Sequence, residues 1–168
     1  MQQWQPLFQQ YCALLLPDIP ISLDYAAAFD VEQGLLHSLD QHRTRDMERT
    51  TTQHGPHRSD LRLKTPLGIA DEVLSRGQKK LLVVALKLSQ IHMLQDLGKE
   101  TVVLLDDFTA ELDDSAQGRL LSTLASLNSQ VFMTILNGDA IKNMQDKLDF
   151  SAVAVFEVSD GQLQAQIF

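Results

Sequence analysis

Val73-Leu-Ser-Arg-Gly-Gln78 opens the segment around which the rest of this sequence is arranged. Ser75 can cap a helix, and Gln78 follows three residues later, where its side chain can reach back to the cap amide in a capping box. Apolar residues then recur at three- and four-residue spacing to about Leu97, and Gly98 supplies a left-handed stop. The sequence therefore predicts a largely buried helix that starts in a polar loop.

The start of this helix suits an anion. Unpaired amides and the positive end of the helix dipole meet there, so a phosphate group is favoured. Ser75 adds a hydroxyl, and Gly77 allows the backbone to approach a ligand closely. An ordinary capped core helix explains the same residues, and these residues alone do not separate the two interpretations.

Composition limits the class of protein. The 168 residues are 44% hydrophobic, which is enough for one sizeable core or for a core with a small appendage. There is no recognisable signal peptide or membrane span, and the single Cys12 cannot form an internal disulfide, so we expect a cytoplasmic protein without a membrane partner. The net charge of −8 argues that any contact with nucleic acid is local.

The most basic stretch is residues 42–64, where arginine and lysine outnumber aspartate and glutamate. Within it, Arg58 and Arg62 are our candidates for contacts with DNA. The alternative is a solvated basic surface without a ligand.

The first third of the sequence predicts a small α+β piece. Residues 2–16 have helical spacing, residues 21–25 alternate as a strand, and residues 31–47 carry a sparse helical pattern. The turn-rich run 50–56 marks a boundary, which we place between residues 54 and 55. We expect the packing partners of this piece in sequence that precedes Met1.

A hairpin is predicted next. Residues 61–64 alternate as an edge strand, and Pro66 and Gly68 turn the chain towards the opening motif.

An unalternating apolar run follows the long helix. Residues 101–105 predict a strand buried on both faces, as in the middle of a parallel sheet covered by helices. This strand ends in Asp106 and Asp107, at the edge where α/β sheets bind ligands. A helix capped by Asp113 and ending near Asn128 comes next.

A second buried strand at residues 130–136 completes a strand–helix–strand unit. Asn137 is expected to start a short helix, and residues 153–168 to form a closing hairpin.

Two carboxylates opposite a phosphate-binding helix start are typical of a site for a nucleotide with Mg²⁺. We assign Asp106 to the metal, because Mg²⁺ prefers oxygen ligands, and Asp107 to a water that attacks the terminal phosphate. A cap or loop role is the alternative for either residue. The phosphate-cradling run G-x-x-x-x-G-K-[ST] is absent from the sequence, so we expect the chain alone to bind nucleotide poorly.

Zinc and nucleophilic chemistry are less well supported. His54 and His57 lie three residues apart in a turn, without a cysteine or histidine cluster of zinc spacing. Ser75 lacks an evident histidine and aspartate pair.

Three motifs resemble those of ABC-type ATPase heads. Leu74-Ser-Arg-Gly-Gln78 resembles the signature motif, Val102-Val-Leu-Leu-Asp-Asp107 the Walker B strand, and Glu111-Leu-Asp113 the D-loop. Gly55-Pro-His-Arg-Ser-Asp-Leu61 and Leu105-Asp-Asp-Phe-Thr-Ala-Glu-Leu-Asp113 place the resemblance within the RecF family. It is strong from Gly55 to Phe168 and looser before.

The resemblance implies the fold. We expect an α/β protein, the C-terminal half of an ABC-type ATPase head with a parallel sheet core, flanking helices and a C-terminal β-hairpin. Residues 55–168 would form this head part, and residues 1–54 would be the end of the arm lobe. The P-loop would lie in the missing first half.

The resemblance also implies a mechanism. Two heads of a homodimer would sandwich ATP and Mg²⁺, with Asp106 at the metal and Asp107 orienting water. The signature residues of one subunit would complete the site of the other, and Asp113 would bridge the subunits. These signature residues are Ser75, Arg76, Gly77 and Gln78. The full-length protein would be a slow ATPase, and this chain alone would be inactive.

The implied partners are DNA at junctions of single and double strands and the proteins RecR and RecO, which help to load RecA at single-strand gaps.

Two departures from the pattern of ABC-type heads agree with slow hydrolysis. Asp107 stands where many ABC heads carry glutamate, and Thr134-Ile-Leu136 stands where a switch histidine often follows the strand.

Two other functions remain open. The first is another SMC-like or ABC-type DNA-processing ATPase, although residues 1–54 show no sustained heptads of a coiled-coil arm. The second is a stand-alone interaction module without catalysis.

Overall fold

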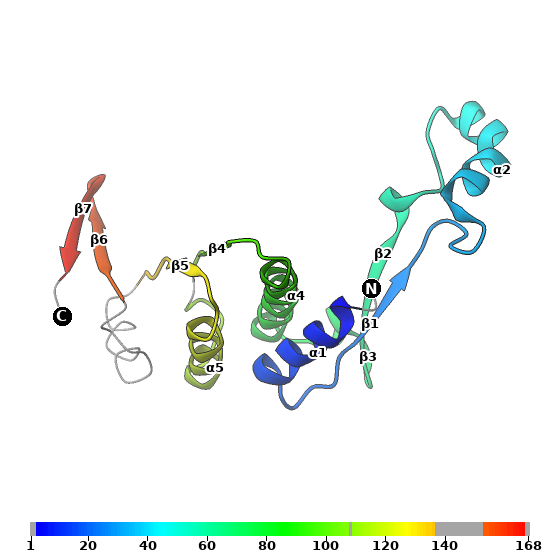
Figure 1. Cartoon of the computed structure of the whole chain (residues 1–168). Coiled ribbons are helices and arrows are strands. Elements are labelled where there is room, and N and C mark those ends of the chain that lie inside the picture. The colour runs from blue at the N-terminus through cyan, green and yellow to red at the C-terminus, as the bar shows by residue number, and fades with distance from the viewer. Residues whose placement is uncertain (1–2, 108, 137–152, 167–168) are drawn as a thin grey trace. The chain divides into compact units, whose positions relative to one another are not determined.

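The protein is described by a computed structural model that covers residues 3–107, 109–136 and 153–166 (Figure 1). Contacts divide the chain into two compact units, Met1–Met93 and Leu94–Phe168. The short helix predicted from Asn137 lies outside the described residues.

Two helices form the core of the first unit. α1 (Trp4–Leu15) and α4 (Arg76–Asp96) are joined by a hydrogen bond of 2.7 Å from the Trp4 indole to the Ser89 hydroxyl. The Tyr11 hydroxyl lies 3.1 Å from Nδ1 of His92. Their buried apolar faces explain why these periodic segments fold as helices, and both predicted helices are confirmed.

The start and stop signals of α4 are confirmed as well. Gly98 has φ +71, and the Lys99 amide donates to the Leu94 carbonyl at 3.0 Å. Glycine tolerates this left-handed turn without a steric cost, so the helix ends where the sequence predicted.

A three-stranded antiparallel sheet belongs to the same unit. It consists of β1 (Ser22–Ala26), β2 (Asp60–Thr65) and β3 (Gly68–Ile69), in the order β1-β2-β3. Leu23 lies opposite Leu63 on one face. The prediction that residues 61–64 form an edge strand is therefore wrong. Local alternation could not reveal that β1, far earlier in the sequence, pairs with the other side of β2.

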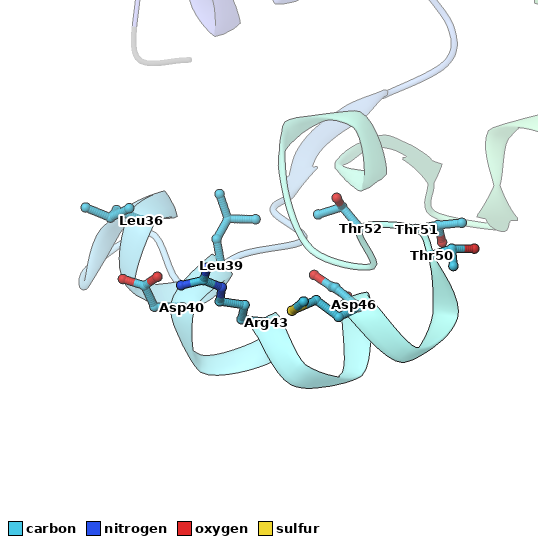
Figure 2. A pocket seen from close by; sticks show the side chains of 9 residues that line it. Leu36, Leu39, Asp40, Arg43, Asp46, Thr50, Thr51 and Thr52 are labelled. Atoms are coloured by element: carbon cyan, nitrogen blue, oxygen red, sulfur yellow. The ribbon is translucent and has the colours of Figure 1, made fainter.

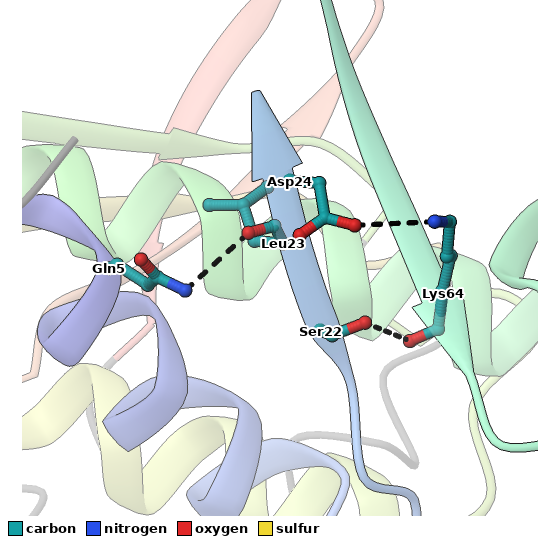
Figure 3. Close-up of polar contacts among 5 residues, drawn as sticks. All are labelled: Gln5, Ser22, Leu23, Asp24 and Lys64. Atoms are coloured by element: carbon teal, nitrogen blue, oxygen red, sulfur yellow. Dashed lines mark hydrogen bonds and ion pairs between the residues drawn. The ribbon is translucent and has the colours of Figure 1, made fainter. Parts of the chain in front are cut away.

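Polar contacts fix β1 in place (Figure 3). The Ser22 hydroxyl donates to the Lys64 carbonyl at 3.4 Å, and the Lys64 ammonium lies 3.3 Å from the Asp24 carboxylate. Gln5 of α1 donates to the Leu23 carbonyl at 3.5 Å. Since the ion pair is solvent-exposed, it contributes at most about 1 kcal/mol, and the sheet depends mainly on its apolar face.

α2 (Gly34–Arg49) and the loop after it complete the first unit, together with η1 (Pro56–Arg58) and α3 (Ala70–Val73). The rings of His42 and His54 stack with centroids 3.6 Å apart, which holds the loop against α2. β1 lies before residues 54 and 55 in the sequence and β2 lies after them, yet the two strands pair with each other. The domain boundary that we placed there stays a prediction.

The second unit contains a parallel strand–helix–strand motif, as predicted. β4 (Val102–Leu105) pairs with β5 (Gln130–Met133), and α5 (Asp114–Ala125) connects them. α5 ends three residues before Asn128, where we expected its end. The Ser126 hydroxyl donates to the Thr123 carbonyl at 2.7 Å and closes the last turn.

The prediction that β4 is buried on both faces is wrong for the described chain. Val103 is 8% exposed, whereas Val102 and Leu104 on the other face are 58% and 77% exposed. Phe132 of β5 is 53% exposed. An apolar run shows that a strand can be covered on both sides, but among the described residues only one face of β4 is covered.

The closing hairpin is confirmed. β6 (Val155–Ser159) and β7 (Gln162–Gln166) pair in antiparallel fashion. Asp160 and Gly161 form the turn with φ of +48 and +76. Positive φ at both central residues matches the twist of a two-residue hairpin.

Candidate functional site

The start of α4 forms the predicted capping box. The Ser75 amide donates to Oε1 of Gln78 at 2.9 Å, and the Gln78 amide donates to Oγ of Ser75 at 3.3 Å. Ser75 and Arg76 are exposed, while Gly77 and Gln78 are partly exposed. The helix start is therefore a surface feature that another molecule can reach.

The charges around this helix start favour an anion. The first turn of α4 contains no acidic residue, although aspartate and glutamate usually stabilise this end of a helix. Instead Lys79 and Lys80 follow directly, and the Lys79 ammonium pairs with the exposed Asp71 carboxylate of α3 at 2.9 Å. The Asp71 carboxylate offsets the charge of Lys79, so the preference for an anion at this helix start rests mainly on the helix dipole.

The predicted pair of carboxylates follows β4 directly. Asp106 is exposed and Asp107 is partly exposed. Asp107 has φ +53, a left-handed conformation that side-chain-bearing residues adopt rarely. The Ala110 amide donates to the Asp107 carbonyl at 3.1 Å and closes the turn. The parallel sheet thus presents both side chains at its carboxyl edge, where ligands of α/β proteins bind.

Thr134 is the residue of this edge that sequence reasoning missed. Its hydroxyl donates to Oδ1 of Asp106 and accepts a hydrogen bond of 2.8 Å from the Asp107 amide. The sequence pattern places Thr134 inside the strand predicted at residues 130–136, whereas β5 ends at Met133 and Thr134 follows it. The signal available in the sequence was a hydroxyl side chain directly after a strand parallel to β4.

Asp113 is the N-cap of α5. Its Oδ1 accepts a hydrogen bond of 2.7 Å from the Ala116 amide, and the residue is exposed. The predicted cap is confirmed. The bridging role between subunits stays a prediction.

The predicted site residues fall into two groups. Residues 75–78 belong to the first unit, and Asp106, Asp107 and Asp113 belong to the second. We call them the signature half-site and the carboxylate half-site. Ser75 and Gln78 bond to each other in the signature half-site, Thr134 bonds to Asp106 and Asp107, and Asp113 caps α5. The pairing of one half-site with the other stays a prediction.

The carboxylate half-site fits Mg²⁺ in its donor chemistry. Asp106 offers exposed carboxylate oxygen, and Mg²⁺ binds through one or two carboxylates together with water and phosphate oxygens. Among the described residues there is no group of three or more histidine, cysteine, aspartate or glutamate side chains that could hold a metal by itself. Mg²⁺ bound at Asp106 would keep water molecules among its ligands, as it usually does in proteins.

The two candidate DNA contacts lie on exposed surface. Arg58 is in η1, and Arg62 projects from β2 on the face opposite Leu63. Arg62 stands directly across from Asp24, which also pairs with Lys64. The acidic neighbour reduces the local positive potential around Arg62.

A hollow that the sequence did not predict lies along α2 (Figure 2). No predicted site residue lines it. Apolar, charged and threonine side chains form its wall: Leu36, Leu39, Asp40, Arg43, Asp46, Met47, Thr50, Thr51 and Thr52. Its signal was the outward spacing of Leu36, Asp40, Arg43 and Met47 on one helix face.

The helices of the described residues include none with the length and apolar character that crossing a bilayer requires.

Comparison with known proteins identifies the family. The model of the RecF/RecN/SMC N terminal domain matches residues 59–161. The DNA replication and repair protein RecF of an Acinetobacter baumannii strain is 54% identical over 163 residues, which are 97% of this chain and 45% of that protein. RecF of a Marinomonas strain is 37% identical over 97% of this chain and 44% of its own length. The chain thus spans about half the length of these curated relatives.

Solved structures agree with this fold. The recombination mediator protein RecF-ATPrS in the RecFOR pathway matches 99% of this chain and 44% of its own, with a TM-score of 0.70 and 22% identity. A structure from work on ATP-driven dimerization of SMC ATPases matches 98% of this chain and 83% of its own, with a TM-score of 0.55 and 18% identity. The fold is that of RecF and SMC ATPase heads. The chain belongs to the RecF/RecN/SMC N-terminal domain family, as a RecF-like segment of an ABC-type ATPase head.

Proposed function

We propose that this chain supplies two half-sites of an ATP-dependent DNA-repair protein of RecF type. The observation that carries the proposal is the turn after β4, where Asp106 and Asp107 stand at the carboxyl edge of a parallel sheet. The anion-favouring helix start at Ser75 supports it independently.

The signature half-site completes the nucleotide site of a second copy. Exposed Ser75 and Gly77 contact the terminal phosphate across the dimer, and Arg76 and Gln78 border it. Asp113 contacts the partner copy. The relation to SMC ATPases, for which ATP-driven dimerization is described, supports this arrangement. Two exposed half-sites that are each incomplete also require a second source of ligand contacts.

The carboxylate half-site performs the chemistry. Asp106 would hold Mg²⁺, and the ion would supply neutralisation of phosphate charge. Asp107 accepts a hydrogen bond from water and orients it towards the terminal phosphate, because phosphoryl transfer depends mostly on positioning and electrostatics. Aspartate is one methylene shorter than glutamate, so hydrolysis is slow.

The biological task that we propose is DNA repair, which the names of the relatives support. The protein binds DNA at junctions of single and double strands, and it acts with RecR and RecO to load RecA at gaps. The described role of the structural neighbour in the RecFOR pathway supports this proposal. Arg58 and Arg62 are the candidate DNA contacts, and reversing both charges should lower the affinity for DNA and flatten its salt dependence.

The test compares the 168-residue chain with a full-length protein. The full-length protein also contains the part of the RecF relatives that the 168-residue chain does not span. We expect Mg²⁺-dependent ATP hydrolysis only from the full-length protein, accompanied by ATP-dependent dimerisation in light scattering. A full-length protein that neither binds ATP nor dimerises with it would favour the non-catalytic interaction module instead.

A further inference from the structure

We propose that Thr134 is a positioning residue for the carboxylate half-site. Its hydroxyl holds the Asp106 side chain and the Asp107 backbone against the end of β5. The inference rests on the proposed ATPase function. It adds to that site a residue that neither the sequence motifs nor the names of the relatives indicate.

The register of the parallel sheet places Thr134. Leu105 pairs with Met133 as the last partners of β4 and β5, and the Thr134 amide donates to the Leu105 carbonyl at 3.0 Å. The ladder thus continues one residue beyond the strand, and the Thr134 side chain reaches the turn that carries Asp106 and Asp107. The backbone bond to Leu105 therefore fixes the position of Thr134 independently of the bonds that its side chain forms.

The hydroxyl bonds leave Thr134 with defined donor and acceptor roles. A threonine hydroxyl has one hydrogen to donate and an oxygen that accepts. The Asp107 amide donates to this oxygen at 2.8 Å, and the hydroxyl donates its hydrogen to Oδ1 of Asp106. Since an ionised carboxylate only accepts, the arrangement is suited to a charged Asp106. One side chain therefore orients the metal ligand and the residue after it.

The left-handed backbone of Asp107 needs such support. Its φ of +53 is unfavourable for a residue with a Cβ atom, and the bond from its amide to Thr134 holds the conformation. Without this bond, the turn can relax and carry the Asp107 carboxylate away from its working position. Small displacements of a water-orienting group slow a reaction that depends on positioning.

The opposite end of the same two strands provides a matched control. The Thr101 hydroxyl lies 2.6 Å from the Ser129 hydroxyl and accepts a hydrogen bond of 3.1 Å from Gln95. Thr101, the residue before β4, therefore bonds to the residue before β5, much as Thr134 bonds to the residues after β4, but none of the described carboxylates bonds to Thr101. Thr101→Val removes a comparable link without touching the half-site.

The first experiment needs no nucleotide. Amide hydrogen exchange of Asp107 is measured by NMR in the 168-residue chain and in its Thr134→Val, Thr134→Ser and Thr101→Val variants. We expect Thr134→Val to accelerate exchange at Asp107 severalfold, with Thr134→Ser and Thr101→Val remaining near the parent rate. Equal exchange in the Val and Ser variants at position 134 would overturn the proposal.

The second experiment measures ATP hydrolysis in the full-length protein. Thr134→Val should lower kcat by roughly 10- to 100-fold, as loss of a partner of a metal ligand commonly does, with little change in KM or in ATP-dependent dimerisation. Thr134→Ser should restore kcat, and Thr101→Val should lower Tm while leaving kcat near the parent value.

The outcomes separate this inference from the proposed function. If the parent hydrolyses ATP and Thr134→Val hydrolyses it equally fast, the role of Thr134 is refuted while the ATPase stands. If the parent does not hydrolyse ATP at all, the proposed function fails, and the exchange experiment still decides whether Thr134 positions Asp107.

Discussion

The two half-sites are built in opposite ways. The signature half-site is local, because both hydrogen bonds of its capping box join residues three positions apart. The carboxylate half-site is non-local, because Thr134 reaches back 28 positions to Asp106 and 27 positions to Asp107. A capping box stabilises any helix, so its presence does not distinguish structure from function. A left-handed aspartate also occurs in ordinary turns, as Asp160 does in the closing hairpin, so the conformation of Asp107 alone does not indicate chemistry. The bonds from Thr134 to both Asp106 and Asp107 are the more specific feature.

The largest effect is expected from Asp107→Asn, which removes the charge of the non-local half-site but nearly keeps its shape. In the full-length protein, hydrolysis should fall by about 10²- to 10⁴-fold, the range for loss of a group that assists proton transfer or orients water. The ATP-bound dimer should accumulate, because binding precedes the lost step. Turnover assays and size-exclusion chromatography with ATP measure both effects, and unchanged turnover would refute the role of Asp107.

The next largest effect separates the two uses of Ser75. Aspartate and asparagine both cap helices well, so Ser75→Asp and Ser75→Asn should leave the monomer folded. The aspartate adds a negative charge where we place a phosphate, and it should weaken ATP-dependent dimerisation at least about tenfold more than the asparagine does. Sedimentation with ATP compares the pair. If the two variants dimerise equally, Ser75 does not contact a phosphate and serves only as a helix cap.

A smaller effect tests the cap itself. Ser75→Ala removes the side-chain oxygen that accepts the Gln78 amide and should lower the free energy of unfolding by about 1 kcal/mol. Urea denaturation of the 168-residue chain measures this loss, and Ser75→Asn is the control that should retain most of the stability. If the alanine variant has the same free energy of unfolding as the parent, water replaces the capping bond.

The smallest effect concerns the buried support of the signature half-site. Cys12 lies in α1, which packs through Trp4 against α4, and burial raises the pKa of its thiol from 9.0 to about 12. The folded state favours the protonated thiol, so its contribution to stability is complete below pH 9 and is lost as the pH rises towards 12. Between about pH 8 and about pH 9.5 the expected loss is less than about 1 kcal/mol.

Urea denaturation at both pH values measures this loss, with Cys12→Ala as the control that removes the titrating group. If the parent and the control show the same pH dependence, the thiol is not buried in solution.

The sequence predicted the local features of the fold well and the non-local ones poorly. Ser75, Gln78 and Gly98 carry the signals that start and stop α4, and both ends formed as predicted. Asp160-Gly161 likewise determined the closing hairpin. In each case the deciding atoms lie within a few residues of one another.

Features that depend on distant partners could not be read in this way. The central position of β2 depends on β1, and the exposure of Leu104 depends on which elements pack against β4. The bonds of Thr134 depend on the parallel register of β4 and β5. The motifs identified Asp106 and Asp107 as site residues, but spacing alone contains no information about what orients them.

The proposed ATP hydrolysis requires that the signature half-site of one copy pairs with the carboxylate half-site of another. Mixing full-length Ser75→Asp with full-length Asp107→Asn tests this pairing most directly, because each variant alone is expected to be inactive. A mixed dimer contains one site with both native residues, and random pairing should restore up to about one quarter of the parental ATP hydrolysis. No recovery on mixing, although mixed dimers form, would contradict a site shared between two copies.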